Sequence, residues 1–148
     1  MTASPTPSRP RVVDIAFWVL VGGAVLLIVG GMLAATVSFE TARSAIDPEV
    51  SNESLRSFLA VQRGVGVGSV LAGAALAFVA GRARRGDPRF RRATVALALA
   101  IAVVLIMLAA GAGVANLVTL LALVPITVGA VLLTRRSAAG WFQQAGAR

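Results

Sequence analysis

Residues 81–92 of the chain read Gly-Arg-Ala-Arg-Arg-Gly-Asp-Pro-Arg-Phe-Arg-Arg. This stretch holds six arginines and lies between two long apolar runs. Short connections that are rich in arginine stay on the cytoplasmic side when a chain inserts into a membrane. The stretch therefore predicts a cytoplasmic connection between two membrane-spanning helices.

Apolar runs on both sides of this stretch are long enough to cross a membrane as helices. Residues 15–37 and 93–113 contain 23 and 21 residues without a charge, and a hydrocarbon core about 30 Å thick needs about 20 helical residues. Residues 59–80 and 117–134 provide two further spans, with Arg63 inside the outer end of the first of them. The sequence therefore predicts an all-α integral membrane bundle of four transmembrane helices, arranged as two helical hairpins.

The arginines are divided unevenly between the two sides of the membrane that these four spans would connect. With both termini and residues 82–92 inside the cell, the inner side holds eleven of the fourteen arginines, and the outer side holds Arg43, Arg56 and Arg63. Cytoplasmic segments carry such an excess of basic residues, so we expect a multi-pass protein of the bacterial plasma (inner) membrane with both termini in the cytoplasm. The formal charge of +8 then reflects topology, and we expect no nucleic-acid partner.

The two ends of the chain differ in composition from the apolar spans, and we expect both to lie outside the membrane core. Residues 1–11 are rich in Pro, Ser and Thr and predict a disordered cytoplasmic tail. Asp14 follows at the entry of the first span, where a carboxylate caps a helix and complements its dipole. Residues 12–136 are the predicted transmembrane domain, and residues 137–148, with two adjacent aromatic residues, predict a cytoplasmic tail that lies along the membrane interface.

The composition removes most catalytic chemistry. The chain has no Cys, His, Lys or Tyr, and 57% of its residues are hydrophobic, which gives a mean hydropathy of +0.86. Thiolate and imidazole ligands, the commonest general base and Schiff-base lysine are therefore absent. The acids Glu40, Asp47, Glu49 and Glu53 are the only cluster that an enzyme acting on lipids could use, and they lie in a predicted solvated loop. We expect no catalytic, cofactor-binding or metal site, and no enzyme.

Small residues recur in the second span at a spacing that favours close helix packing. Two helix backbones can approach each other where small residues recur every four positions. The rows are Ser69, Gly73, Ala77 and Gly81, and Gly64, Gly68 and Ala72. The pattern specifies contact but not the partner: packing within the protein's own bundle is the first expectation, and a second copy of the chain or a larger membrane protein are the alternatives.

The arginines that follow this span are candidate lipid contacts. Basic residues beside a membrane gain about 1 kcal/mol each near an anionic surface. The candidates for contact with the anionic inner leaflet are Arg82, Arg84, Arg85, Arg89, Arg91 and Arg92. Docking of an acidic cytosolic partner, or a role limited to topology, would explain the same residues.

Three stretches at the predicted membrane borders carry a resemblance. They are residues 9–18 (RPRVVDIAFW), residues 81–92 and residues 135–142 (RRSAAGWF). Together they resemble small actinobacterial conserved transmembrane proteins with four spans, a group without a known activity. The resemblance implies a plasma-membrane location, and it implies no activity and no site residues.

The predicted function is one of contact. The rows of small residues and the lack of reactive side chains predict a non-catalytic accessory or scaffold subunit that acts through helix–helix contacts. The alternative is an oligomeric small transporter or lipid-handling protein. That alternative needs a polar route through the membrane, lined by residues such as Asp14, Arg63 or Thr127.

Overall fold

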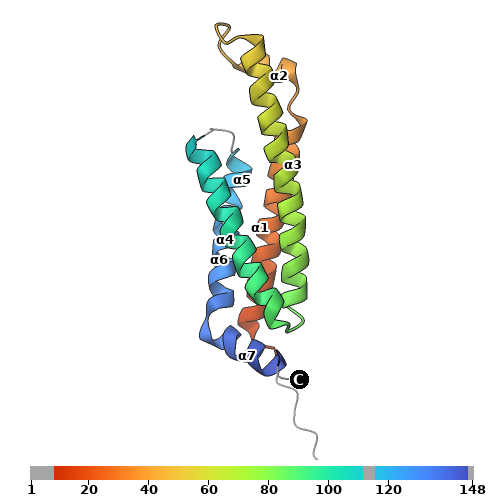
Figure 1. The fold of residues 1–148 in the computed structure, drawn as a ribbon, viewed down its shortest axis with the longest axis vertical. Helices are drawn as coiled ribbons and strands as arrows, with labels where there is room; N and C mark the ends of the chain where they lie inside the picture. The colour runs from red at the N-terminus through yellow and green to blue at the C-terminus, as the bar shows by residue number, and fades with distance from the viewer. Residues whose placement is uncertain (1–8, 112–115, 147–148) are drawn as a thin grey trace, which may run out of the picture.

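The structure is a computed structural model that describes residues 9–111 and 116–146. Within these ranges all regular structure is helical, as predicted (Figure 1). The helices are α1 (Arg11–Thr36), α2 (Phe39–Ala45), α3 (Asn52–Ala83), α4 (Pro88–Gly111), α5 (Leu117–Leu121), α6 (Leu123–Thr134) and α7 (Arg136–Gly146). Four segments are long and apolar enough to cross a membrane, namely α1, α3, α4 and the pair α5 and α6.

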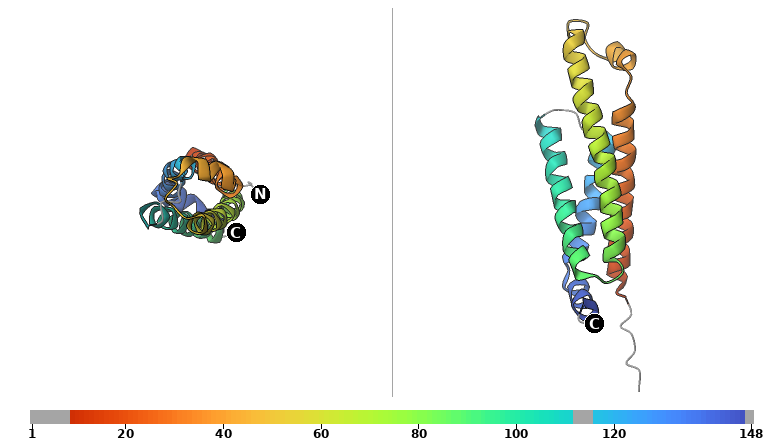
Figure 2. Two further views of the ribbon diagram at one scale, coloured as in Figure 1. Left: turned by 90° about the horizontal axis from the view of Figure 1, so that it is seen from above. Right: turned by 45° about the vertical axis from the view of Figure 1, so that its right-hand side comes forward.

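The second of these helices is longer than the apolar run that predicts it. α3 begins at Asn52, where the Ser51 side chain accepts a hydrogen bond from the backbone nitrogen of Ser54, and it spans 32 residues. At about 1.5 Å per residue it is about 48 Å long, against about 36 Å for α4. The predicted span, residues 59–80, lies within α3, and Leu55 and Leu59 near the start of the helix are already buried. The first turns of α3 extend with α2 beyond the ends of α4 and α5 (Figure 2).

The arginine-rich connection is much shorter than predicted. α3 ends at Ala83 and α4 begins at Pro88, a residue that suits the first position of a helix because it lacks a backbone donor. The carboxylate of Asp87 accepts a hydrogen bond from the backbone nitrogen of Arg89 at 2.9 Å, and Gly86 supplies the turn with a φ of 96°. Only four residues connect the helices, and the last three arginines of the stretch belong to α4.

α1 packs along α3 and approaches it through glycines. A Cβ added at Gly31 would lie 2.5 Å from the carbonyl oxygen of Gly66, and one added at Gly73 would lie 2.9 Å from the carbonyl oxygen of Ala24. Distances of this size leave no room for a side chain. The two backbones are therefore in direct contact at two levels along the bundle.

A second face of α1 packs against α5 and α6. A Cβ at Gly23 would clash with the side chain of Ile126, and one at Gly30 would clash with the hydroxyl of Thr119. Asn116 caps α5 by accepting a hydrogen bond from the backbone nitrogen of Thr119, and its side-chain nitrogen donates to the carbonyl oxygen of Gly30; both distances are 2.8 Å. The side chain of Asn116 thus joins the start of α5 to Gly30, in the last third of α1.

The last apolar segment is interrupted close to its proline. Pro125 cannot donate a hydrogen bond to the carbonyl oxygen of Leu121, and the helix is divided at Ala122 into α5 and α6.

α7 closes one end of the bundle. Ala138 and Phe142 of α7 are buried against the rest of the protein. The starts of α1 and α4, the end of α3 and all of α7 lie at this end (Figure 1), and we call it the basic end. Its arginines among the described residues are Arg9, Arg11, Arg82, Arg84, Arg85, Arg89, Arg91, Arg92, Arg135 and Arg136.

Candidate functional site

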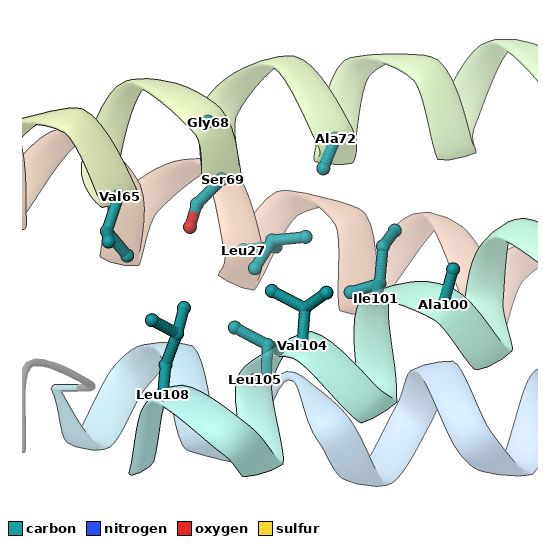
Figure 3. A pocket seen from close by; sticks show the side chains of 10 residues that line it. All are labelled: Leu27, Val65, Gly68, Ser69, Ala72, Ala100, Ile101, Val104, Leu105 and Leu108. Atoms are coloured by element: carbon teal, nitrogen blue, oxygen red, sulfur yellow. The ribbon is translucent and has the colours of Figure 1, made fainter. Parts of the chain in front are cut away.

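A hollow of about 420 Å³ lies between α3 and α4. We call it the α3–α4 groove; its lining residues are Leu27, Val65, Gly68, Ser69, Ala72, Ala100, Ile101, Val104, Leu105 and Leu108 (Figure 3). Side chains of α4 point across it towards α3, and Leu27 of α1 lies at its back (Figure 3). Of the ten residues, only Ser69 has a polar side chain. The groove is an apolar surface made largely by two helices.

Most of the large side chains in the groove belong to α4, and most of the α3 residues that line it are small. α3 contributes Gly68 and Ala72, whereas α4 contributes branched side chains such as Val104 and Leu105. Apart from the two adjacent residues and the nearby backbone of α3 itself, no described heavy atom lies within 4 Å of a Cβ added at Gly68. α4 is thus held away from the part of the α3 backbone that glycine exposes.

The predicted rows of small residues are divided between two environments. Ser69 and Gly73 are buried against α1, and Ala77 lies at the edge of the core. Gly64, Gly68 and Gly81 have no described neighbour within 4 Å of an added Cβ. A row of residues four apart rotates by about 40° per step around a helix, so it leaves any straight contact after two or three steps.

Gly66 is the close contact that the row pattern misses. It lies three residues before Ser69 and seven before Gly73, which is the spacing of one helix face. A Cβ at Gly66 would lie 2.5 Å from the carbonyl oxygen of Gly31. A search of the sequence for small residues at i, i+3 and i+7 would have found it.

At the basic end, a polar hollow of about 460 Å³ is lined by Arg9, Phe17, Gly81, Arg84 and Arg85. We call it the basic pocket. Arg84 is held on two sides: its Nε donates to a carboxylate oxygen of Asp14 at 2.9 Å, and its guanidinium lies 4.7 Å from the ring centroid of Phe17. Such contacts fix the orientation of the guanidinium group.

The predicted capping role of Asp14 is wrong. Pro10 is the residue at the cap position of α1, and it makes no side-chain capping bond. The same carboxylate oxygen of Asp14 accepts hydrogen bonds from Arg9 at 3.0 Å and from Arg84 at 2.9 Å. No local sequence pattern indicates the second contact, because it joins residues 70 positions apart.

The other candidate lipid-binding arginines have different surroundings. Arg91 is half-buried, donates through Nε to the carbonyl oxygen of Leu133 at 2.8 Å, and lies over the ring of Phe142. Arg82 is exposed and lies over two phenylalanine rings. Arg89 and Arg92 are exposed on the first turns of α4. The structure therefore brings together Arg84 and Arg85 with Arg9, and it uses Arg91 to anchor α7.

The opposite end of the bundle holds the acidic residues in an open arrangement. Glu40, Asp47, Glu49 and Glu53 are all exposed, and Arg43 donates hydrogen bonds to two backbone carbonyl oxygens of the turn between α2 and α3. Within the described ranges no three His, Cys, Asp or Glu residues are grouped closely enough to hold a metal ion.

The two hollows suit the binding of different ligands. The α3–α4 groove offers apolar surface, and the basic pocket offers guanidinium donors; these are properties of sites for a hydrophobic segment and for an anion. Comparisons of the chain with protein-family models, with curated proteins and with solved structures give no match.

Proposed function

We propose that this protein is a non-catalytic accessory or scaffold subunit of the bacterial plasma membrane, and that its α3–α4 groove binds one transmembrane helix of a partner membrane protein. The observation that carries the proposal is the open space beside Gly68 in an otherwise apolar groove between two helices of membrane-spanning length.

A helix is a better occupant than a disordered lipid chain. Glycine inside a helix costs about 1 kcal/mol relative to alanine, so Gly64 and Gly68 weaken α3 without any packing contact of their own among the described residues. Gly64, Gly68 and Ala72 lie four residues apart, the spacing at which a second helix backbone comes close. An acyl chain needs no such close approach, because it packs equally well on larger aliphatic side chains.

The membrane orientation is part of the same proposal. The fold collects ten arginines at the basic end, and the described arginines of the opposite end are Arg43, Arg56 and Arg63. Positive charge favours the cytoplasmic side in short connections. We place the basic end, and with it both termini of a four-span protein built from two helical hairpins, in the cytoplasm.

The arrangement of polar residues favours an accessory role over a transporter. Arg84, which pairs with Asp14, lies about 30 Å along α3 from Arg63 at about 1.5 Å per residue, and Thr127 is exposed on α6. These groups are therefore spread along the bundle. The α3–α4 groove itself contains one hydroxyl group.

Photocrosslinking in native membranes tests the proposal. A photoreactive amino acid at Val104 lines the groove, and the same probe at Val128 lies on the exposed side of α6. We expect a discrete adduct only from position 104, with the crosslinked peptide of the partner mapping to a transmembrane segment. Gly68→Leu should abolish this adduct by filling the groove.

A matched control separates docking from general effects of a larger side chain. Gly22 of α1 is exposed, and a Cβ added there meets no described atom within 4 Å, so Gly22→Leu should leave the adduct at position 104 intact. Adducts to lipid alone, or an adduct that survives Gly68→Leu, would refute helix docking in the groove. An adduct to a second copy of the chain would show that the groove binds another copy of this protein and not a different partner protein.

A further inference from the structure

We propose that the basic pocket binds the phosphate headgroup of an anionic phospholipid. The inference concerns a different surface from the α3–α4 groove and does not depend on what occupies that groove. It is based on four observations: the donors that line the pocket, the way in which Arg84 is held, the net charge, and the aromatic residues beside it.

The lining of the basic pocket is unusually rich in hydrogen-bond donors. Three of its five residues are the arginines Arg9, Arg84 and Arg85. A fourth is Gly81, where an added Cβ would meet no described atom within 4 Å. The planar donor groups of these arginines match the oxygens of a phosphate. The wall at Gly81 is open, so a phosphate would have room beside them.

Arg84 is positioned before any ligand arrives. Its Nε is engaged by Asp14, and its guanidinium plane is held near the rings of Phe17 and Trp18, at 4.7 and 5.9 Å from their centroids. Its two terminal nitrogens make no hydrogen bond to the described residues. Arg85 makes no side-chain hydrogen bond or ion pair within residues 9–111 and 116–146. These donors remain available to an anion.

The charge of the pocket calls for an anionic ligand. The pocket is lined by three guanidinium groups, and two of them, those of Arg9 and Arg84, share the single carboxylate of Asp14. The cluster keeps a formal charge of +2, because arginine stays protonated at all accessible pH values. A phosphate group matches this charge and accepts several hydrogen bonds at once.

The neighbouring apolar surface favours a lipid as the source of the phosphate. Trp18 is 61% exposed beside the pocket, and Phe78, one turn before Gly81 on α3, is 59% exposed. Tryptophan is enriched at the level of lipid headgroups. A phospholipid could place its headgroup in the pocket and its acyl chains against the exposed sides of α1 and α3.

Quenching of tryptophan fluorescence by brominated lipid tests the proposal on the full chain. The protein has two tryptophans, so Trp141→Phe leaves Trp18 as the only reporter. The protein is placed in phosphatidylcholine vesicles that contain increasing fractions of brominated phosphatidylglycerol or, for comparison, brominated phosphatidylcholine. We expect phosphatidylglycerol to be preferred at least about tenfold in the lipid layer around Trp18.

Matched variants separate a site from general attraction to an anionic surface. Arg85→Gln and Arg92→Gln remove the same charge from the same end of the bundle, and both side chains are exposed without a described hydrogen-bond partner. We expect Arg85→Gln to lower the preference at least about fivefold and Arg92→Gln to lower it less than twofold. Equal losses would overturn the proposal, because charge alone would then explain lipid binding.

A second pair of variants leaves the charge unchanged. Gly81→Leu should obstruct the pocket, and Gly140→Leu, on α7 at the same end, adds the same side chain where no described atom lies within 4 Å. Loss of the preference with Gly81→Leu alone supports the site, whereas retention in Gly81→Leu refutes it. Competition by soluble glycerol phosphate distinguishes the sources: displacement of the lipid at millimolar concentration would keep a phosphate site but overturn its assignment to a membrane lipid.

Discussion

Substitution of Gly66 by alanine should separate α1 from α3. A Cβ at this position would lie 2.5 Å from the carbonyl oxygen of Gly31 and 2.8 Å from the backbone nitrogen of Ala35. Both atoms belong to the backbone of α1, so no rotation of a side chain relieves the clash. To restore an ordinary contact of 3.4 Å, the helices must move apart locally by about 0.9 Å.

The expected cost follows from two opposing effects. Overpacking of a well-packed interior costs about 1–3 kcal/mol, and a clash with backbone belongs in the upper part of that range. Alanine regains up to about 1 kcal/mol of helix propensity relative to glycine. Gly66→Ala should therefore lower the free energy of unfolding by about 1–2 kcal/mol.

Gly64→Ala is the matched control, because it makes the same chemical change two residues earlier on the same helix. No described atom lies within 4 Å of an added Cβ there, so only the gain in propensity remains, about 0.5–1 kcal/mol. Unfolding in mixed micelles with increasing SDS, followed by circular dichroism, measures both variants. Equal stability of Gly66→Ala and Gly64→Ala would show that the backbones of α1 and α3 do not clash with a Cβ at position 66.

Three further substitutions test other parts of the structure. Asn116→Ala should cost about 1–2 kcal/mol in the same unfolding assay, because it removes the cap of α5 and the hydrogen bond to α1; Asn116→Ser should recover the part due to the cap. Asp14→Asn should cause a small loss of stability that disappears at high salt, since both of its ion pairs are partly exposed and screened, and a loss independent of salt would contradict this. Phe142→Ala should release α7 and speed tryptic cleavage near Arg136 at least about tenfold, because a buried aromatic anchor is lost, whereas Gln143→Ala on the exposed side should leave cleavage unchanged.

The helices were predictable because length and apolarity act locally. Each predicted span overlaps a described helix, or the pair α5 and α6, that is long and apolar enough to cross a membrane, and the class of the fold follows from that alone. Helix ends were less predictable, since α3 continues to Asn52 through polar residues whose helical state depends on a serine cap and on two buried leucines. An apolar run reports the part of a helix that suits the membrane, and a helix can extend beyond it.

The candidate sites were only partly predictable, because they depend on contacts between distant residues. Arg91 and Leu133 are 42 residues apart, and no local pattern distinguishes Arg91 from the exposed Arg92 beside it. The rows of small residues identified the right helix, but only the structure shows which members contact α1 and which face the groove. The residue types predicted that arginines would bind anions and that small residues would contact helices. Which of these residues are free to do so depends on how the helices pack.

The position of Gly68 leads to a last prediction that links stability to the proposed function. Filling the groove with Gly68→Leu should raise the free energy of unfolding of the isolated protein by about 1 kcal/mol, because leucine is the better helix former and its side chain has open space to enter. The same variant should lose the crosslink from Val104. We expect the isolated Gly68→Leu protein to be more stable and the crosslink from position 104 to be lost together only if the groove binds a helix of another protein. If Gly68→Leu destabilises the isolated protein instead, α3 and α4 already pack more tightly there than the structure shows, and the loss of a crosslink would have a trivial structural cause.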